Sequence, residues 1–257
     1  MQKFVQTRVK DAGATGVVLG LSGGIDSATT LSLAVSALGS ENVKGLIMPF
    51  KKSESIFLAL DHANSLSIDT KTYDISVIVN SYKEISDSFT SKNSEGNLHS
   101  RIRMSLLYGE AFSSNKLVIG TSNKSELLVG YYTKWGDGAS DFLPLGDLYK
   151  SQVYTLAKDL EVPASILERV PTAELWEGQS DEEELGISYE TLDKILLGLE
   201  RQISLSDITL KTGIDMDSVS RIEALLKSTI HKRVFPPVCK IGRRTVGLDW
   251  RETIGSK

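Results

Sequence analysis

The chain has 257 residues, of which 40% are hydrophobic and 24% charged, and its formal net charge is −4. These ordinary values exclude an intrinsically disordered chain, a collagen-like repeat and a membrane-spanning class. The acidic balance argues against a nucleic-acid partner. Cys239 is the single cysteine, so no intrachain disulfide can form. The first eleven residues predict an amphipathic helix without signal-peptide features, which makes the cytoplasm the expected location.

Short β-rich runs alternate with helical patterns through the first 150 residues. Residues 16–21, 43–48, 70–75 and 116–120 predict strands, whereas residues 27–38, 53–66, 77–88 and 98–112 predict helices. Ser53 is the expected N-cap of the second helix in that series. The alternation predicts an α/β fold with a doubly wound, mostly parallel sheet and helices on both faces. In such sheets ligands bind at the carboxyl ends of the strands.

Helical patterns dominate after residue 150, most clearly at residues 150–160, 189–199 and 217–230. We therefore expect a single domain over residues 1–257, with an α/β nucleotide-binding core at 1–150 and a mainly helical extension at 151–257. The charged stretch at residues 179–184 (QSDEEE) is expected to be a solvated loop, with a mobile lid as the alternative. Residues 87–97 and 175–185 are polar and lack apolar periodicity, so we expect mobile loops there that close over a site.

The segment with the strongest chemical signal is residues 20–27 (GLSGGIDS), which follows the first predicted strand and opens a helix. Backbone N–H groups and the positive end of a helix dipole converge in such a turn, and its glycines let an oxyanion approach, so it predicts a phosphate site. No Gly-Lys-Ser/Thr follows, which excludes a Walker A loop. Asp26 beside a phosphate requires an intervening cation, and Mg²⁺ is the natural choice. The alternative is an ordinary glycine-rich strand–turn–helix connection.

This loop resembles the pyrophosphatase loop of the N-type ATP pyrophosphatases, which cleave ATP between the α- and β-phosphates and adenylate a substrate. The later segments are similar, in the same order, to those of ammonia-dependent NAD synthetases: residues 97–104 (NLHSRIRM), 120–126 (GTSNKSE), 131–141 (YYTKWGDGASD), 144–150 (PLGDLYK), 171–175 (PTAEL) and 231–233 (HKR). The resemblance spans most of the chain. Ser100 departs from it where alanine is usual, and Asn123 with Lys124 replaces a different pair found in many bacterial members.

The resemblance implies the adenine nucleotide alpha-hydrolase-like fold and the ATP-dependent amidation of deamido-NAD by ammonia. It also implies a homodimer that binds the dinucleotide across its interface, with no nucleic acid or membrane involved. No glutaminase domain is expected in this length of chain, so free ammonia is the expected nitrogen donor unless a separate subunit delivers it. No residue is assigned as a covalent nucleophile or general base.

The resemblance assigns roles to particular residues. Asp26 and Glu126 resemble the Mg²⁺ ligands, and aromatic stacking on the nicotinate ring is expected from Tyr131, Tyr132 and Trp135. The expected ATP contacts are Gly20, Leu21, Ser22, Gly23, Gly24, Ile25, Asp26, Ser27, Thr121, Lys150 and Thr172. The expected deamido-NAD contacts are Arg101, Lys134, Asp141, His231 and Lys232.

Other interpretations of these residues stay open at this point. Arg101 and Arg103 point to different sides of their helix, and we expect Arg101 to bind substrate while Arg103 makes a structural ion pair. His62, His99 and Cys239 are expected to be structural or inert. One rival function is another enzyme of the same loop family, which adenylates a different acid or a tRNA base. A second rival is a non-catalytic ATP-binding protein on a similar fold.

Overall fold

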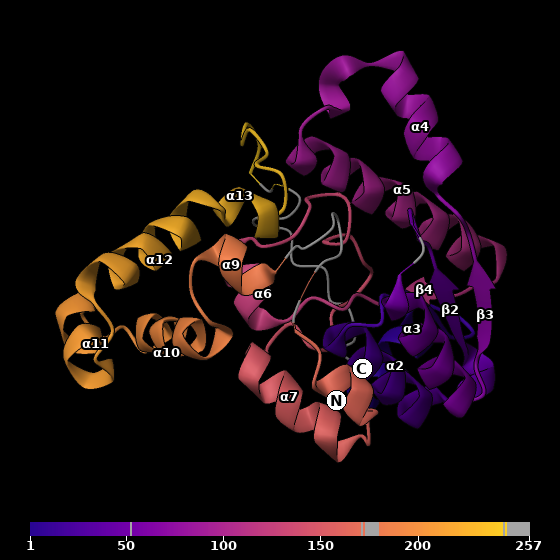
Figure 1. Ribbon diagram of the computed structural model, residues 1–257, viewed down its shortest axis with the longest axis horizontal. Coiled ribbons are helices and arrows are strands. Elements are labelled where there is room, and N and C mark those ends of the chain that lie inside the picture. Colours follow the sequence, from indigo (N-terminus) through magenta and orange to yellow (C-terminus); the bar gives the residue numbers. More distant parts are fainter. Residues whose placement is uncertain (52, 171, 173–179, 244, 246–257) are drawn as a thin grey trace.

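The computed structural model describes residues 1–51, 53–170, 172, 180–243 and 245 (Figure 1). Its centre is a four-stranded parallel sheet in the order β3-β2-β1-β4. The strands are β1 (Val17–Gly20), β2 (Val43–Ile47), β3 (Asp69–Thr72) and β4 (Leu117–Val118). Within the described residues, no helix is both long and apolar enough to cross a membrane.

Helices cover both faces of this sheet, because successive buried residues of β1 point to opposite sides. Val17 and Leu19 pack in a core with helices α1 (Gln2–Asp11), α2 (Ile25–Leu38) and α3 (Glu54–Ser65). Val18 packs in a second core with α4 (Ser76–Ile85) and α5 (Lys92–Ser113). The expected doubly wound α/β fold is therefore confirmed. The short 3₁₀ helices are η1 (Ser40–Asn42) and η2 (Asp87–Phe89).

The order of the strands creates a switch point beside β1. The chain passes from β1 to β2 and β3 on one side of the sheet, and β4 then pairs with β1 on its other side. Connections therefore leave the carboxyl ends of β1 and β4 in different directions, which opens a crevice between them. The loop into α2 and the loop into α6 (Lys124–Val129) both start at this crevice.

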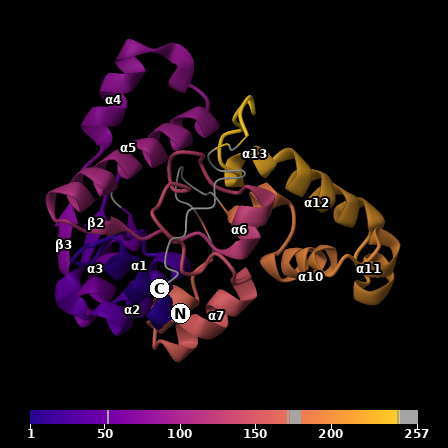
Figure 2. The ribbon, with the colours of Figure 1, turned by 180° about the vertical axis from the view of Figure 1, so that it is seen from behind.

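The C-terminal part of the chain forms a helical arm beside the sheet, and both views show α10, α11 and α12 on the side away from it (Figures 1 and 2). Leu192, Ile195 and Val219 are fully buried in a core of this arm, which Val129 and Tyr149 join. Because Val129 belongs to α6 and Tyr149 precedes α7, the arm packs directly against the segments next to the crevice. Two helices of this part of the chain, α7 (Lys150–Asp159) and α8 (Ala164–Leu167), pack on α2 instead. The helices of the arm are α9 (Asp181–Leu185), α10 (Tyr189–Glu200), α11 (Leu205–Thr212), α12 (Met216–Ser228) and α13 (Ile230–Arg233).

Two loop predictions are corrected by the structure. The expected loop at residues 87–97 contains η2 and, from Lys92 onward, the first turns of α5, because the Ser91 side chain accepts a hydrogen bond from Ser94 N and caps the helix. The expected solvated loop at residues 179–184 is largely α9, whose acidic first turn suits the positive end of a helix dipole. The remainder of that lid candidate, residues 175–179, lies outside the described residues.

Candidate active site

A cavity of about 1070 Å³ lies at the carboxyl ends of β1 and β4. Nearly all of the residues predicted to contact ATP line this cavity, and Gly23 is the exception. Most of them come from the loop after β1 and the start of α2. Thr121 lies in the loop after β4, Lys150 begins α7, and Thr172 follows α8 in the chain. The predicted contacts on its wall are Gly20, Leu21, Ser22, Gly24, Ile25, Asp26, Ser27, Thr121, Lys150 and Thr172.

The glycine-rich loop is held in shape by its own backbone and two serines. Gly23 has φ +75°, and a Cβ atom at this position would lie 2.3 Å from the carbonyl oxygen of Ser55, so only glycine fits without strain. The Ser22 hydroxyl accepts from Gly24 N at 3.2 Å and lies 3.1 Å from the Ser27 hydroxyl, which also donates to Gly24 O. Gly24 is the N-cap residue of α2, so the positive end of this helix faces the cavity.

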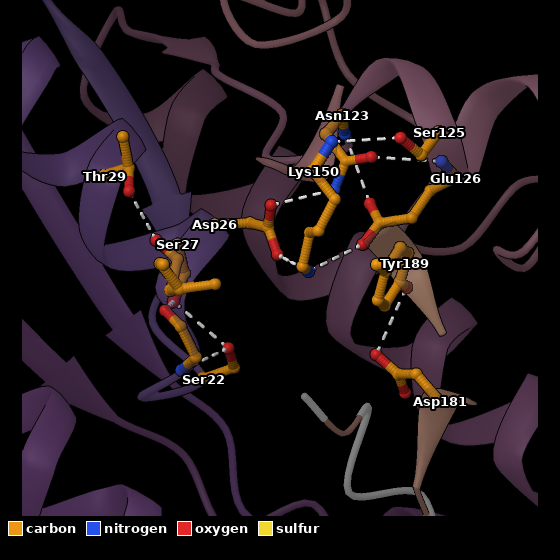
Figure 3. Close-up of polar contacts among 12 residues, drawn as sticks. Ser22, Asp26, Ser27, Thr29, Asn123, Ser125, Glu126, Lys150, Asp181 and Tyr189 are labelled. Atoms are coloured by element: carbon orange, nitrogen blue, oxygen red, sulfur yellow. Dashed lines mark hydrogen bonds and ion pairs between the residues drawn. The ribbon is translucent and has the colours of Figure 1, made fainter. Parts of the chain in front are cut away.

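Three charged side chains from three helices meet on the cavity wall (Figure 3). Lys150 Nζ lies 2.5 Å from Asp26 Oδ2 and 3.2 Å from Glu126 Oε1. Asn123 supports both carboxylates: its side-chain amide donates to Asp26 Oδ1 at 2.9 Å, and its backbone N–H donates to Glu126 Oε2 at 3.1 Å. Asn123 and Glu126 also form the capping box of α6, an N-x-x-E signal that would have revealed this short helix from the sequence.

This cluster holds two carboxylates against a single ammonium group. Burial raises the pKa of Glu126, and the nearby Asp26 charge raises it further, against the opposing effect of Lys150. Burial lowers the pKa of Lys150, but the charges of Asp26 and Glu126 outweigh that effect and leave it above its ordinary value. Lys150 therefore stays protonated, whereas Glu126 binds a proton more tightly than an ordinary carboxyl group, and a cation bound between the two carboxylates would displace that proton.

Two further carboxylates line the same cavity and were not predicted from the sequence. Asp181 and Glu184 of α9 both accept from the Tyr131 hydroxyl, at 3.1 and 2.5 Å, and Tyr189 OH lies 3.5 Å from Asp181. Asp181 is only 5% exposed, although its run of acidic residues was interpreted as a solvated surface. Burial of the phenol, together with the bond to Glu184, raises the pKa of Tyr131. The ring of Tyr189 also contacts Lys150 Nζ, 4.8 Å from the ring centre.

The residues predicted to contact deamido-NAD lie mostly outside this cavity. Lys232 lines it and donates from Nζ to Gly130 O and Tyr132 O at 2.6 and 2.8 Å. Lys134 Nζ donates to His231 O at 2.7 Å, and Arg101 donates to Lys134 O at 3.4 Å. The structure thus brings four of the five predicted residues together, where residues 130–134 meet α13.

Asp141 lies apart from that group, at the sheet edge. Its carboxylate accepts from Val118 N at 2.7 Å, beside an isolated parallel bridge between Ile119 and Phe142 that extends the sheet past β4. Of the three aromatic residues expected to stack on nicotinate, Tyr131 and Tyr132 line the cavity, whereas Trp135 is 55% exposed and is not among the described residues of its wall.

Arg103, rather than Arg101, belongs to the wall of the cavity. Its Nε donates to Met48 O at 3.0 Å, which ties α5 to the end of β2. Arg169 also lines the cavity and donates to Gly23 O at 3.4 Å. Neither arginine was predicted to be near the ATP site. The family motifs that supply the predicted ATP contacts give no ATP-binding role to Arg103 or Arg169.

Comparisons with known proteins find similar chains both in sequence and in structure. The model of the NAD synthase family matches residues 1–236. The chain is 47% identical to the NH(3)-dependent NAD(+) synthetase of Thermococcus kodakarensis over 234 residues, which cover 91% of this chain and 92% of the relative. Two similar solved structures, both with a TM-score of 0.79, are an NH3-dependent NAD synthetase from Campylobacter jejuni and an NMN synthetase from Francisella tularensis.

The Campylobacter structure is 37% identical, and the similarity covers 93% of this chain and 96% of that one. The Francisella structure is 35% identical, with 94% and 99% covered. Matches at this level of identity and on the same fold show common ancestry over most of the chain. The chain belongs to the NAD synthase family.

Proposed function

We propose that the chain catalyses the ATP-dependent amidation of deamido-NAD to NAD with ammonia. The observation that carries this proposal is the cluster of the buried Lys150 with the half-buried Asp26 and Glu126 beside the glycine-rich loop, in a chain of the NAD synthase family. A phosphate-binding loop without a Walker A lysine, next to two carboxylates and a buried lysine, suits cleavage at the α-phosphate of ATP.

The reaction needs ATP because a carboxylate cannot lose an oxide ion to ammonia. An oxygen of the nicotinate carboxylate attacks the α-phosphorus of ATP, and the bond to pyrophosphate breaks. Ammonia then attacks the acyl carbon of the adenylate, AMP leaves with the former carboxylate oxygen, and one proton is released. The loop from Gly20 to Ser27 and the ammonium group of Lys150 would bind the ATP phosphates and stabilise the charge that develops as pyrophosphate leaves.

Asp26 and Glu126 are the residues that would hold Mg²⁺. Their carboxylate oxygens are the hard ligands this ion prefers, and a bound cation would relieve the repulsion between the two carboxylates that raises the pKa of Glu126. No group of three or more His, Cys, Asp or Glu side chains in the described part of the chain is arranged to hold a metal, so phosphate and water oxygens would complete the shell. Bound there, Mg²⁺ would neutralise phosphate charge during ATP cleavage.

For deamido-NAD, we retain the contacts that the family resemblance implies. Arg101, Lys134, His231 and Lys232 form one basic group next to the cavity, which suits a dinucleotide with a pyrophosphate bridge. Asp141 would accept from a ribose hydroxyl or a developing ammonium group. A homodimer that binds the dinucleotide across its interface would explain why most of these residues lie outside the ATP cavity.

A product assay tests the proposed function. Purified protein is mixed with deamido-NAD, ATP, Mg²⁺ and ammonium, and the products are separated by chromatography. NAD and AMP in equal amounts support the proposal, and glutamine in place of ammonium tests the nitrogen donor. The mononucleotide counterpart of the substrate is run in parallel, because one similar structure is an NMN synthetase.

The assay also separates the rival functions. AMP and pyrophosphate without NAD would show that adenylation is real and that the acceptor or the nitrogen donor is a different molecule. A folded chain that leaves ATP intact under all of these conditions would contradict the synthetase function and favour a non-catalytic ATP-binding protein.

A further inference from the structure

A buried carboxylate outside the cavity connects the two segments that carry Glu126 and Lys150. Asp193 of α10 is 6% exposed and is not among the described residues of the cavity wall. Its Oδ1 accepts from the Ser125 hydroxyl at 2.5 Å, and its Oδ2 accepts from Ser151 N at 2.9 Å. Ser125 directly precedes Glu126 in the chain, and Ser151 directly follows Lys150, so each oxygen holds a neighbour of one charged site residue.

A third hydrogen bond closes these contacts into a ring. The Ser125 hydroxyl, which is fully buried, accepts from Lys150 N at 3.0 Å (Figure 3). Lys150 N and Ser151 N belong to the first turn of α7, where N–H groups have no acceptor within their own helix. Ser125 and Asp193 satisfy both of them, and the carboxylate also interacts favourably with the positive end of the α7 dipole.

The ring fixes the first turn of α6 against the first turn of α7. Glu126 and Lys150 project from these turns into the cavity, where Lys150 Nζ meets Glu126 Oε1 at 3.2 Å and Asp26 Oδ2 at 2.5 Å. The two helices are joined by a long irregular segment, so their relative position depends on contacts such as this ring. An outer contact reinforces it: Glu200, also from α10, binds Lys124 at 2.9 Å and the hydroxyl of Tyr149.

We propose that Asp193 is a positioning residue for the ATP chemistry: through Ser125 and the start of α7 it holds Glu126 and Lys150 at the separation that catalysis requires. This inference rests on the proposed function. It assigns to the helical arm a direct part in the reaction, because the buried Asp193 of α10 holds the neighbours of two charged residues, while Tyr189 of the same helix contacts Lys150 with its ring. Errors of about 1 Å in such positions cost on the order of 100-fold in rate.

Two substitutions break the ring in different places. Asp193→Asn keeps the size of the side chain but replaces one acceptor by an NH₂ group, which cannot accept from Ser151 N or Ser125 Oγ. Ser125→Ala removes a single hydroxyl and leaves the bond between Asp193 and Ser151 N intact. The matched control is Asp215→Asn, because Asp215 is also a carboxylate that accepts from a helix N-terminus, at 2.7 Å from Ser218 N, but it caps α12 away from the cavity.

We expect both ring variants to lower kcat for NAD formation by about 10- to 100-fold at saturating substrates, while Asp215→Asn keeps the kcat of the unmodified chain. All rates are measured at a temperature at which circular dichroism shows every variant to be folded. MgATP binding, measured by calorimetry without deamido-NAD, is expected to weaken about threefold to tenfold in the ring variants only. The double variant is expected to lose no more activity than the poorer single variant, because both act on one ring.

The outcomes separate this proposal from the proposed function. If the unmodified chain forms NAD and both ring variants keep kcat and MgATP affinity within about twofold, Asp193 serves stability alone and the positioning role is wrong. Losses that multiply in the double variant would overturn the shared ring as their cause. No NAD from the unmodified chain contradicts the proposed function instead. If Asp193→Asn does not fold, Ser125→Ala decides the question by itself.

Discussion

Lys150 Nζ lies 2.5 Å from Oδ2 of Asp26, although 124 residues separate the two in the sequence. The contact forms because α2 starts at the end of β1, α6 follows the neighbouring β4, and α7 packs against α2 with its first residue at the same crevice. Burial of a lysine with two carboxylates is costly unless all three groups have partners. Here Lys150 pairs with both carboxylates and Asn123 donates a hydrogen bond to each of them, so all three groups have partners.

Removal of either carboxylate is the first prediction. Asp26→Asn and Glu126→Gln keep the shape of the side chains but remove the charge that would bind Mg²⁺, so we expect NAD formation to fall at least about 100-fold. The control is Glu190→Gln on α10, an exposed residue paired with Lys194, which should leave the rate unchanged. The rate is measured as NAD formed at saturating Mg²⁺ and ATP. Either site variant with more than about a tenth of the normal rate would contradict a role in metal binding.

Stability should depend on pH through Glu126 when no Mg²⁺ is added. Its pKa in the folded protein is raised above the ordinary 4.5, so the folded state binds a proton there more tightly than the unfolded state. Its contribution is therefore fully present below about pH 4.5 and is lost as the pH rises toward the raised value. We expect Glu126→Gln to remove this loss, so that the variant gains stability relative to the unmodified chain between about pH 5 and pH 8.

Urea unfolding midpoints at several pH values, with EDTA present, measure that difference. The sign is the decisive feature: a variant that becomes less stable than the unmodified chain as the pH rises would show that Glu126 is held as a favourable ion with Lys150. Repeating the series with Mg²⁺ should reduce the difference, because the ion stabilises the charged form of Glu126.

The sequence predicted the parts of the site that lie in local motifs. The loop of residues 20–27 could be assigned to phosphate binding because a strand, two glycines and a helix start follow one another directly. Glu126 and Lys150 could be placed near Asp26 only through the family resemblance, since nothing in their spacing shows that α6 and α7 start at the same crevice. The parallel direction of the strands followed from the alternation of strands and helices, whereas their order in the sheet did not.

Other parts of the site depend on long-range packing and were not predictable. Asp181 belongs to an acidic run that is typical of a solvated surface. It is buried because α9 packs beside Tyr131 and Tyr189, whose hydroxyl groups both lie within hydrogen-bond distance of its carboxylate. The contact of Asp193 with Ser125 likewise exists only after the helical arm packs against α6. The hydrophobic pattern also placed the start of α5 too late, at residue 98 instead of Lys92. The cap formed by Ser91 lets the helix begin in a polar stretch that has no apolar periodicity.

Gly23 should not tolerate a side chain, in contrast to a glycine on the surface of a helix. We expect Gly23→Ala to reduce both activity and stability, the latter by about 1–3 kcal/mol, because φ is +75° and the new Cβ would approach Ser55 O to 2.3 Å. At Gly109 in α5, an added methyl group would meet no atom within 4 Å, so Gly109→Ala should instead stabilise by up to about 1 kcal/mol. Chemical denaturation measures the free energy of unfolding of both variants. A change of the same sign in the two variants would contradict this interpretation.

A second charged cluster, remote from the cavity, should contribute to stability but not to catalysis. Glu110 of α5 is only 10% exposed and binds Lys44 at 2.7 Å, Lys71 at 2.9 Å and the hydroxyl of Tyr73 at 3.0 Å. It thereby ties α5 to β2 and to the edge strand β3. The hydrogen bonds from Lys44 and Lys71 lower the pKa of Glu110 to about 2.

We therefore expect Glu110→Gln to destabilise the protein by about 1 kcal/mol at pH 7, with kcat unchanged. Because the pKa of Glu110 is lower in the folded state than the ordinary 4.5, its contribution is present above pH 4.5 and is lost as the pH falls toward 2. The difference between the variant and the unmodified chain, measured as urea midpoints at pH 7, 4 and 3, should shrink in that order. A difference that stays constant over this range would mean that the carboxylate charge is not what stabilises this junction, and a change in kcat would mean that α5 transmits its position to the cavity.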